Sequence, residues 1–132
     1  MKFKGHKVLV IGDTHDSPHI PQDRFHWIGK HIKKVNPDYI VHIGDFSSFD
    51  SLSYFQKNDS QQGKLKDAFM VDIESMLSAL KILDKYVKDY PHHICIGNHE
   101  LRVHKFEEKI PEIQGMMKNS LYNCFNEFDW TH

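Results

Sequence analysis

Cysteines are few in this sequence, basic residues are not in excess, and long apolar runs are missing. The two cysteines, Cys95 and Cys124, form no C-x-x-C pair and Cys95 lies in an apolar run, which argues against a disulfide framework and for a cytoplasmic protein. With 17 Lys and Arg against 18 Asp and Glu, the net charge of -1 offers no basic surface for nucleic-acid phosphates. Nucleic acid is therefore expected only as a substrate.

No segment of the sequence resembles a targeting signal or a membrane span. Near the N-terminus, the apolar run from Val8 to Ile11 is too short for the core of a secretory signal. No later segment approaches the ~20 apolar residues that a membrane-spanning helix needs. We expect no membrane partner, and the oligomeric state stays open.

The 132 residues are enough for one domain with its own core, and no low-complexity stretch or boundary divides them. We therefore interpret residues 1–132 as a single domain. Its last part carries a dense apolar series that needs a surface to pack on: Leu121, Tyr122, Phe125, Phe128 and Trp130. Because the series runs almost to the last residue, we expect the domain to be truncated at its C-terminus.

Three short apolar runs, each followed by glycine, predict β-strands at residues 7–11, 39–43 and 92–96. The first run is rich in β-branched residues, which is typical of a strand buried on both faces. Because helical patterns separate the runs, the order is β-α-β-α-β, and parallel strands with right-handed crossovers are expected. The predicted fold class is α/β.

The segments between the strands show helical periodicity. Apolar steps of three and four predict an amphipathic helix over residues 23–35, which an Asn-Pro pair ends. A clearer stripe predicts a core-facing helix over residues 69–87. Residues 46–63 are polar and are expected to be a loop with about one helical turn at residues 52–55. A short helix is predicted over residues 100–108.

The three strands end in one recurring pattern, a glycine followed by side chains with ligand atoms. The segments are Ile11-Gly12-Asp13-Thr14-His15, Ile43-Gly44-Asp45 and Ile96-Gly97-Asn98-His99-Glu100. Because ligands bind outside the carboxyl ends of parallel strands, these ends would meet at one site. If the backbone stays extended, Asp13 and His15 point the same way and offer one ion a carboxylate and an imidazole. A divalent metal is the natural occupant.

Each of these residues has a plainer interpretation when taken alone. Asp45 would be a turn or cap residue, His15 a partly buried histidine and Asn98 a turn former. Arg102, close to the site in sequence, is expected to be a solvent-facing arginine of a helix. The agreement of residue types, strand ends and order favours one shared metal site.

In this order and spacing, the Asp-x-His, Gly-Asp and Gly-Asn-His-Glu segments resemble the first three signature motifs of the calcineurin-like metallophosphoesterases. The resemblance covers residues 7–102. It implies the β-α-β-α-β half of a four-layer α/β/β/α sandwich, one sheet face of which should be unusually exposed. It also implies a cofactor of two divalent metal ions, with Mn²⁺, Fe²⁺, Zn²⁺ and Ni²⁺ as candidates.

The same resemblance implies a role for each residue of the site. Asp13 and His15 would bind one ion, and Asp45 would bridge both. Asn98 would bind the second ion, and His99 would be the catalytic residue. In that family water attacks phosphorus in line at the metal pair, while the histidine protonates the leaving oxygen or stabilises its charge. The implied function is that of a metal-dependent hydrolase of phosphate mono- or diesters.

The sequence departs from the family pattern in two places. Many members carry Asp, often followed by Arg, three places after the bridging Asp, where this chain has Ser48 and Phe49. The family's later motifs supply further histidines, including a Gly-His-x-His, and no segment after Gly115 matches them. The second ion would then lack an imidazole ligand, so we expect it to bind weakly.

Two alternatives to the enzyme stay open. One is a truncated, catalytically incompetent module that binds metal or a partner through its exposed sheet edge and aromatic tail. The other is a metal-dependent nuclease, against which the net charge of -1 argues. The sequence leaves open the substrate, the choice between monoester and diester, the metal identity and whether the chain is a fragment.

Overall fold

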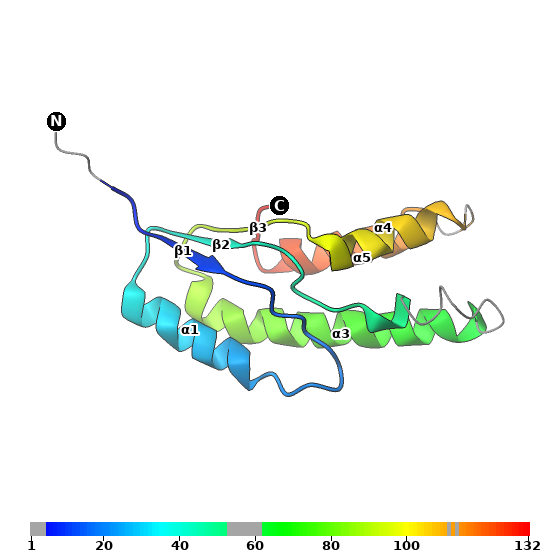
Figure 1. Ribbon diagram of the computed structural model, residues 1–132, viewed down its shortest axis with the longest axis horizontal. Coiled ribbons are helices and arrows are strands. Elements are labelled where there is room, and N and C mark those ends of the chain that lie inside the picture. Colours follow the sequence, from blue (N-terminus) through cyan, green and yellow to red (C-terminus); the bar gives the residue numbers. More distant parts are fainter. Residues whose placement is uncertain (1–4, 53–61, 111, 113) are drawn as a thin grey trace.

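The computed structural model describes residues 5–52, 62–110, 112 and 114–132 (Figure 1). The elements follow in the order β1 (Val8–Ile11), α1 (Asp23–Val35), β2 (Tyr39–His42), α3 (Gln62–Val87), β3 (His92–Ile94), α4 (Asn98–Glu108) and α5 (Met116–Glu127). The predicted α/β class and β-α-β-α-β order are confirmed. Helices α1 and α3 lie side by side along one side of the sheet, and α5 packs against α3 and α4.

The three strands form a parallel sheet in the order β1-β2-β3. In its register, Ile11 pairs with His42, and His42 pairs with Ile94. All three side chains are buried. Strands β2 and β3 end at His42 and Ile94, earlier than predicted, although the N–H groups of Ile43 and Cys95 still donate to the carbonyls of Ile11 and His42.

The opposite face of the sheet is exposed. Val8, Val10 and Tyr39 are 49%, 60% and 46% exposed. The prediction that the first strand is buried on both faces is therefore wrong, because none of the described helices covers this side. The exposed sheet face that the family resemblance implied is confirmed.

Helix α1 has the predicted bounds, and its C-terminal cap explains why. Asn36 adopts a left-handed conformation with φ of 50°, and its N–H donates to the Ile32 carbonyl at 2.8 Å. The proline that follows cannot continue the helix. Gly29 allows α1 to approach α3 closely, since a Cβ at this position would overlap the Tyr86 ring.

The segment between β2 and α3 differs from the predicted loop over residues 46–63. Residues 50–52 are already helical, while residues 53–55 of the predicted turn lie outside the described chain. Helix α3 begins at Gln62, before the start at residue 69 that its core stripe predicts. Its predicted core stripe is confirmed, and the buried members are Phe69, Ile73, Met76, Leu80, Leu83 and Val87.

Helix α5, which the sequence analysis does not predict, gives the C-terminal apolar series its packing surface. Phe125 and Trp130 are buried. Trp130 meets the His92 ring edge-on with centroids 4.6 Å apart, and Thr131 forms a parallel bridge with His93. The series therefore packs within this chain, against α3 and β3.

Candidate metal centre

Backbone hydrogen bonds join the loops that follow β1 and β2. The N–H groups of His15 and Asp16 donate to the carbonyls of Asp45 and Phe46 at 3.0 and 2.7 Å. The convergence predicted from the glycine pattern is therefore observed for these two strand ends.

His15, Asp45 and His99 form a cluster that is able to hold a metal ion. One ligand atom of each lies within 4.8 Å of the others, and all three side chains are half-buried. The His15 and His99 rings meet edge-on with centroids 4.5 Å apart, and Asp13 Oδ2 lies 3.5 Å from His15 Nε2. Within the described parts of the chain, no other group of three His, Cys, Asp or Glu residues brings its ligand atoms this close together.

The sequence analysis assumed an extended backbone at His15, but the structure has a turn there. Its φ of 46° lies in the left-handed region, where its N–H can reach the Asp45 carbonyl. Asp13 and His15 still meet, so their pairing depends on this turn and not on strand alternation.

Asp45 lies where the ends of β2 and β3 come closest. Its φ is 54°, and its Oδ1 accepts a hydrogen bond from the N–H of His99 at 2.8 Å. Gly97 permits this contact, because a Cβ there would overlap atoms of Asp45, and Gly44 turns the chain with a φ of 103°. The two glycines thus bring the carboxylate against the start of α4.

Glu100 supports Asp45 from inside the protein, a role that the sequence analysis does not assign. Its buried carboxylate accepts hydrogen bonds from the N–H groups of Asp45, Phe46 and Gly97 at 2.9, 2.7 and 3.1 Å. Burial raises the pKa of Glu100, and the N–H donors oppose that rise. The sequence carries one signal for this role of Glu100, its spacing: a Glu three residues after a helix cap position is typical of a capping box.

The ring of His99 is oriented by the backbone of Ser48, whose carbonyl oxygen lies 2.6 Å from Nδ1. Because a carbonyl only accepts, Nδ1 carries the hydrogen, and Nε2 is the atom left for a metal ion or a substrate. The Ser48 carbonyl thus supports the ring at a position where the motif pattern that the sequence resembles often has an aspartate. The two uses of Nε2 exclude each other, so His99 is either a ligand or a proton donor.

Asn98 is the first residue of α4 and is exposed. It directly precedes His99, whose N–H bonds to Asp45. Its assignment as a ligand of the second ion stays a prediction.

His42 ties the two loops together beneath the cluster, and the sequence analysis does not assign it a function. Its Nδ1 accepts the N–H of Gly44 at 3.1 Å, so Nε2 carries the hydrogen and donates to Thr14 Oγ1 at 3.0 Å. Thr14 in turn donates to the Phe46 carbonyl at 2.9 Å. Burial lowers the pKa of His42 to about 4, although nearby carboxylates oppose the shift. The ring is therefore neutral at pH 7.

Acidification should destabilise the metal-free protein through His42. Its folded-state pKa of about 4 lies below the ordinary value of 6.5, so the unfolded state binds more protons between these values and stability falls as the pH drops from 6.5 to 4. The expected loss is about 3 kcal/mol. In urea unfolding, His42→Asn should lack this loss, while its amide oxygen can still accept from Gly44.

Two other buried groups change the stability with pH in the opposite direction, raising it as the pH falls. Burial raises the pKa values of Glu100 and Asp72, but both groups are present in the wild type and in the variant. The difference between the two pH profiles therefore isolates His42. Parallel profiles would contradict a buried neutral ring.

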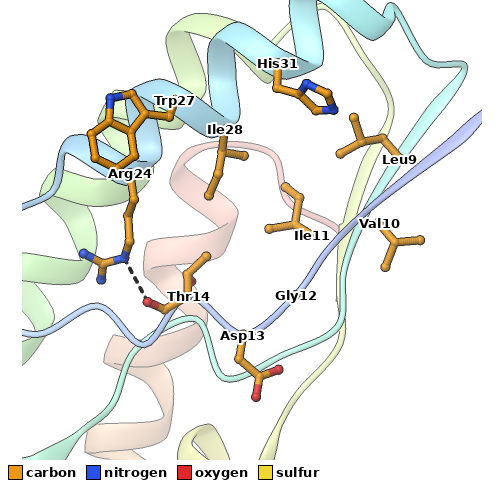
Figure 2. Close-up of a pocket in the computed structure, with 10 residues that line it drawn as sticks. All are labelled: Leu9, Val10, Ile11, Gly12, Asp13, Thr14, Arg24, Trp27, Ile28 and His31. Carbon is orange, nitrogen blue, oxygen red and sulfur yellow. Dashed lines mark hydrogen bonds between the residues drawn. The ribbon is translucent and has the colours of Figure 1, made fainter.

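An open groove of about 510 Å³ runs between β1 and α1 beside Asp13 (Figure 2). Its walls are mainly apolar, and Trp27 and Ile28 of α1 lie across from β1. Arg24 Nε donates to the Thr14 carbonyl at 3.0 Å. This contact holds the loop between Asp13 and His15 against α1.

A family model for the calcineurin-like phosphoesterases matches residues 6–132. The chain therefore belongs to the calcineurin-like phosphoesterase family. The match continues beyond residues 7–102, which carried the resemblance, and includes α5. A search of curated proteins and a search of solved structures returned no significant match. The family is generally hydrolytic and uses divalent metals, and the cluster described above suits that chemistry.

Proposed function

We propose that the chain hydrolyses phosphate mono- or diesters with the help of two divalent metal ions. One observation carries the proposal: ligand atoms of His15, Asp45 and His99 lie within 4.8 Å of one another. They do so at the carboxyl ends of parallel strands, where open α/β sheets bind their ligands. Family membership supports a phosphate ester as the substrate.

The donor set suits a divalent transition metal. Imidazole and carboxylate ligands together favour Mn²⁺, Fe²⁺, Zn²⁺ or Ni²⁺. We assign Asp13 and His15 to one ion, Asp45 to both and Asn98 to the second. Asp45 can bridge because its Oδ1 is oriented by one N–H, while its Oδ2 has no hydrogen-bond partner among the described residues.

The chain's own residues have separate tasks in this reaction. Bound divalent ions would polarise the phosphoryl oxygens and activate water. The N–H of His99 fixes the Asp45 carboxylate, and the Ser48 carbonyl orients the His99 ring. With Nδ1–H held in this way, a His99 ring that carries a second proton, on Nε2, would give that proton to the leaving oxygen.

Metal removal tests the proposed function. The chain loaded with Mn²⁺ should hydrolyse p-nitrophenyl phosphate or bis-p-nitrophenyl phosphate, EDTA should abolish the activity, and added Mn²⁺ should restore it. The ratio of the two rates separates a monoesterase from a diesterase. Hydrolysis that persists in a metal-free sample, or no hydrolysis with two ions bound per chain, would contradict the proposal.

A second candidate function is a metal- or partner-binding module without activity. The exposed sheet face around Val8, Val10 and Tyr39 favours it. One bound ion per chain without hydrolysis would support this module. The assay with bis-p-nitrophenyl phosphate also bears on the alternative of a nuclease, because a nuclease hydrolyses phosphate diesters.

The redox state of the two cysteines is relevant to the cellular compartment in which the protein works. We propose that the protein works in the cytoplasm, because Cys95 and Cys124 are both free thiols and a reducing compartment keeps them so. Among the described helices, none combines the length and the apolar character needed to cross a membrane.

A further inference from the structure

Arg102 lies beside the metal cluster, whereas the sequence analysis expects a solvent-facing arginine. It is half-buried on α4, three residues after His99 and so on the same face of the helix. Its Nη1 donates to the Ser48 carbonyl at 3.2 Å, and His99 Nδ1 contacts the same oxygen at 2.6 Å. One carbonyl therefore holds the guanidinium and the imidazole side by side.

The Arg102 guanidinium has more donors than its protein contacts use. An arginine has five N–H donors, and the bond to Ser48 is the only one found for Arg102 in the described residues. None of the described carboxylates lies within ion-pair distance of it. Arg24 differs, because it donates to two backbone carbonyls and approaches Asp16 at 4.0 Å.

We infer that Arg102 binds a nonbridging oxygen of the substrate's phosphoryl group. The inference rests on the proposed phosphoesterase function and adds a second substrate-binding side chain to the site. A guanidinium without a carboxylate partner complements the charge of a phosphoryl group, and its planar fork fits two phosphate oxygens. Because Ser48 already orients the side chain, little conformational freedom is left to lose on binding.

The test uses inorganic phosphate as a probe that needs no turnover. Phosphate affinity of the Mn²⁺-loaded full chain is measured by calorimetry, with metal content determined on the same samples. Arg102→Gln, which can still donate to Ser48, should weaken phosphate binding about 10- to 100-fold, the range of a charge-assisted hydrogen bond. Arg102→Lys keeps the charge without the planar fork of donors, so it should lose less phosphate affinity than Arg102→Gln. Lys105→Ala removes the same charge from an exposed position of α4 and should bind phosphate like the wild type.

The outcomes separate this inference from the proposed function. Unchanged phosphate affinity in Arg102→Gln, in a protein that hydrolyses phosphate esters, would overturn the inference alone. Loss of metal together with phosphate would also overturn it, because Arg102 would then act on the metal site. If the Mn²⁺-loaded wild type binds no phosphate and hydrolyses no ester, the proposed function fails and the inference fails with it.

Discussion

Asp45→Ala should weaken Mn²⁺ binding far more than Asn98→Ala. A bridging carboxylate contributes charge to both ions, whereas a neutral amide contributes to one. We expect a loss of more than about 100-fold for Asp45→Ala, beyond the range for residues that only support ligands, and about tenfold for Asn98→Ala. Calorimetric titration of both variants with Mn²⁺ or Zn²⁺ measures the difference.

The structure offers two matched variants for this comparison. Asp45→Asn keeps an oxygen that can accept the His99 N–H and removes only the charge, so it should lose nearly as much affinity as Asp45→Ala. Asp38→Asn makes the same change at the opposite end of β2, where Asp38 bonds to the N–H of Lys7, and should bind metal like the wild type. Equal losses for Asp45→Ala and Asn98→Ala, or none, would show that the bridging assignment is wrong.

His99→Ala should lower kcat by about 10²–10⁴-fold while bound metal stays nearly unchanged, as expected for loss of a general acid. The N–H that orients Asp45 belongs to the backbone and survives the substitution. The loss should be larger for alkyl phosphates than for p-nitrophenyl phosphate, because a good leaving group needs less protonation. Steady-state kinetics on both substrates, with metal content measured on the same samples, gives the result.

His104→Ala is the control for this experiment. His104 lies on the same helix but bonds to the Tyr122 hydroxyl, and its removal should leave kcat and metal content unchanged. The position of His99 in the metal-holding cluster defines the competing outcome. If metal is lost together with activity, His99 is a metal ligand. If both substrates suffer equally with metal retained, it stabilises charge without donating a proton.

Local patterns predicted the elements whose folding depends on nearby residues. The helix over residues 23–35 was found because its apolar steps and its Asn-Pro end are all local signals, and the structure has those bounds. The core stripe of α3 was found in the same way. Helix α5 was not predicted, although its buried residues Met117, Leu121, Cys124 and Phe125 recur at helical spacing. Residues 62–68 of α3 were left out of the predicted helix, because that prediction rested on the apolar stripe that begins at Phe69.

Support for the site could not be predicted from local patterns. Glu100, His42 and the Ser48 carbonyl act on the cluster through contacts between segments 28 to 55 residues apart. No spacing rule relates such distant positions, so neither the buried carboxylate nor the neutral ring was assigned a task. Arg102 was expected in solvent for the same reason.

The sequence by itself determined the α/β order and the family, because a glycine and a ligand side chain follow each strand and parallel strands end at one edge. Only the tertiary structure decided how those ends meet. The left-handed turns at His15 and Asp45 and the close contact of Gly44 with Gly97 set the cluster. Such contacts depend on the packing of distant backbone segments, which a local sequence pattern does not encode.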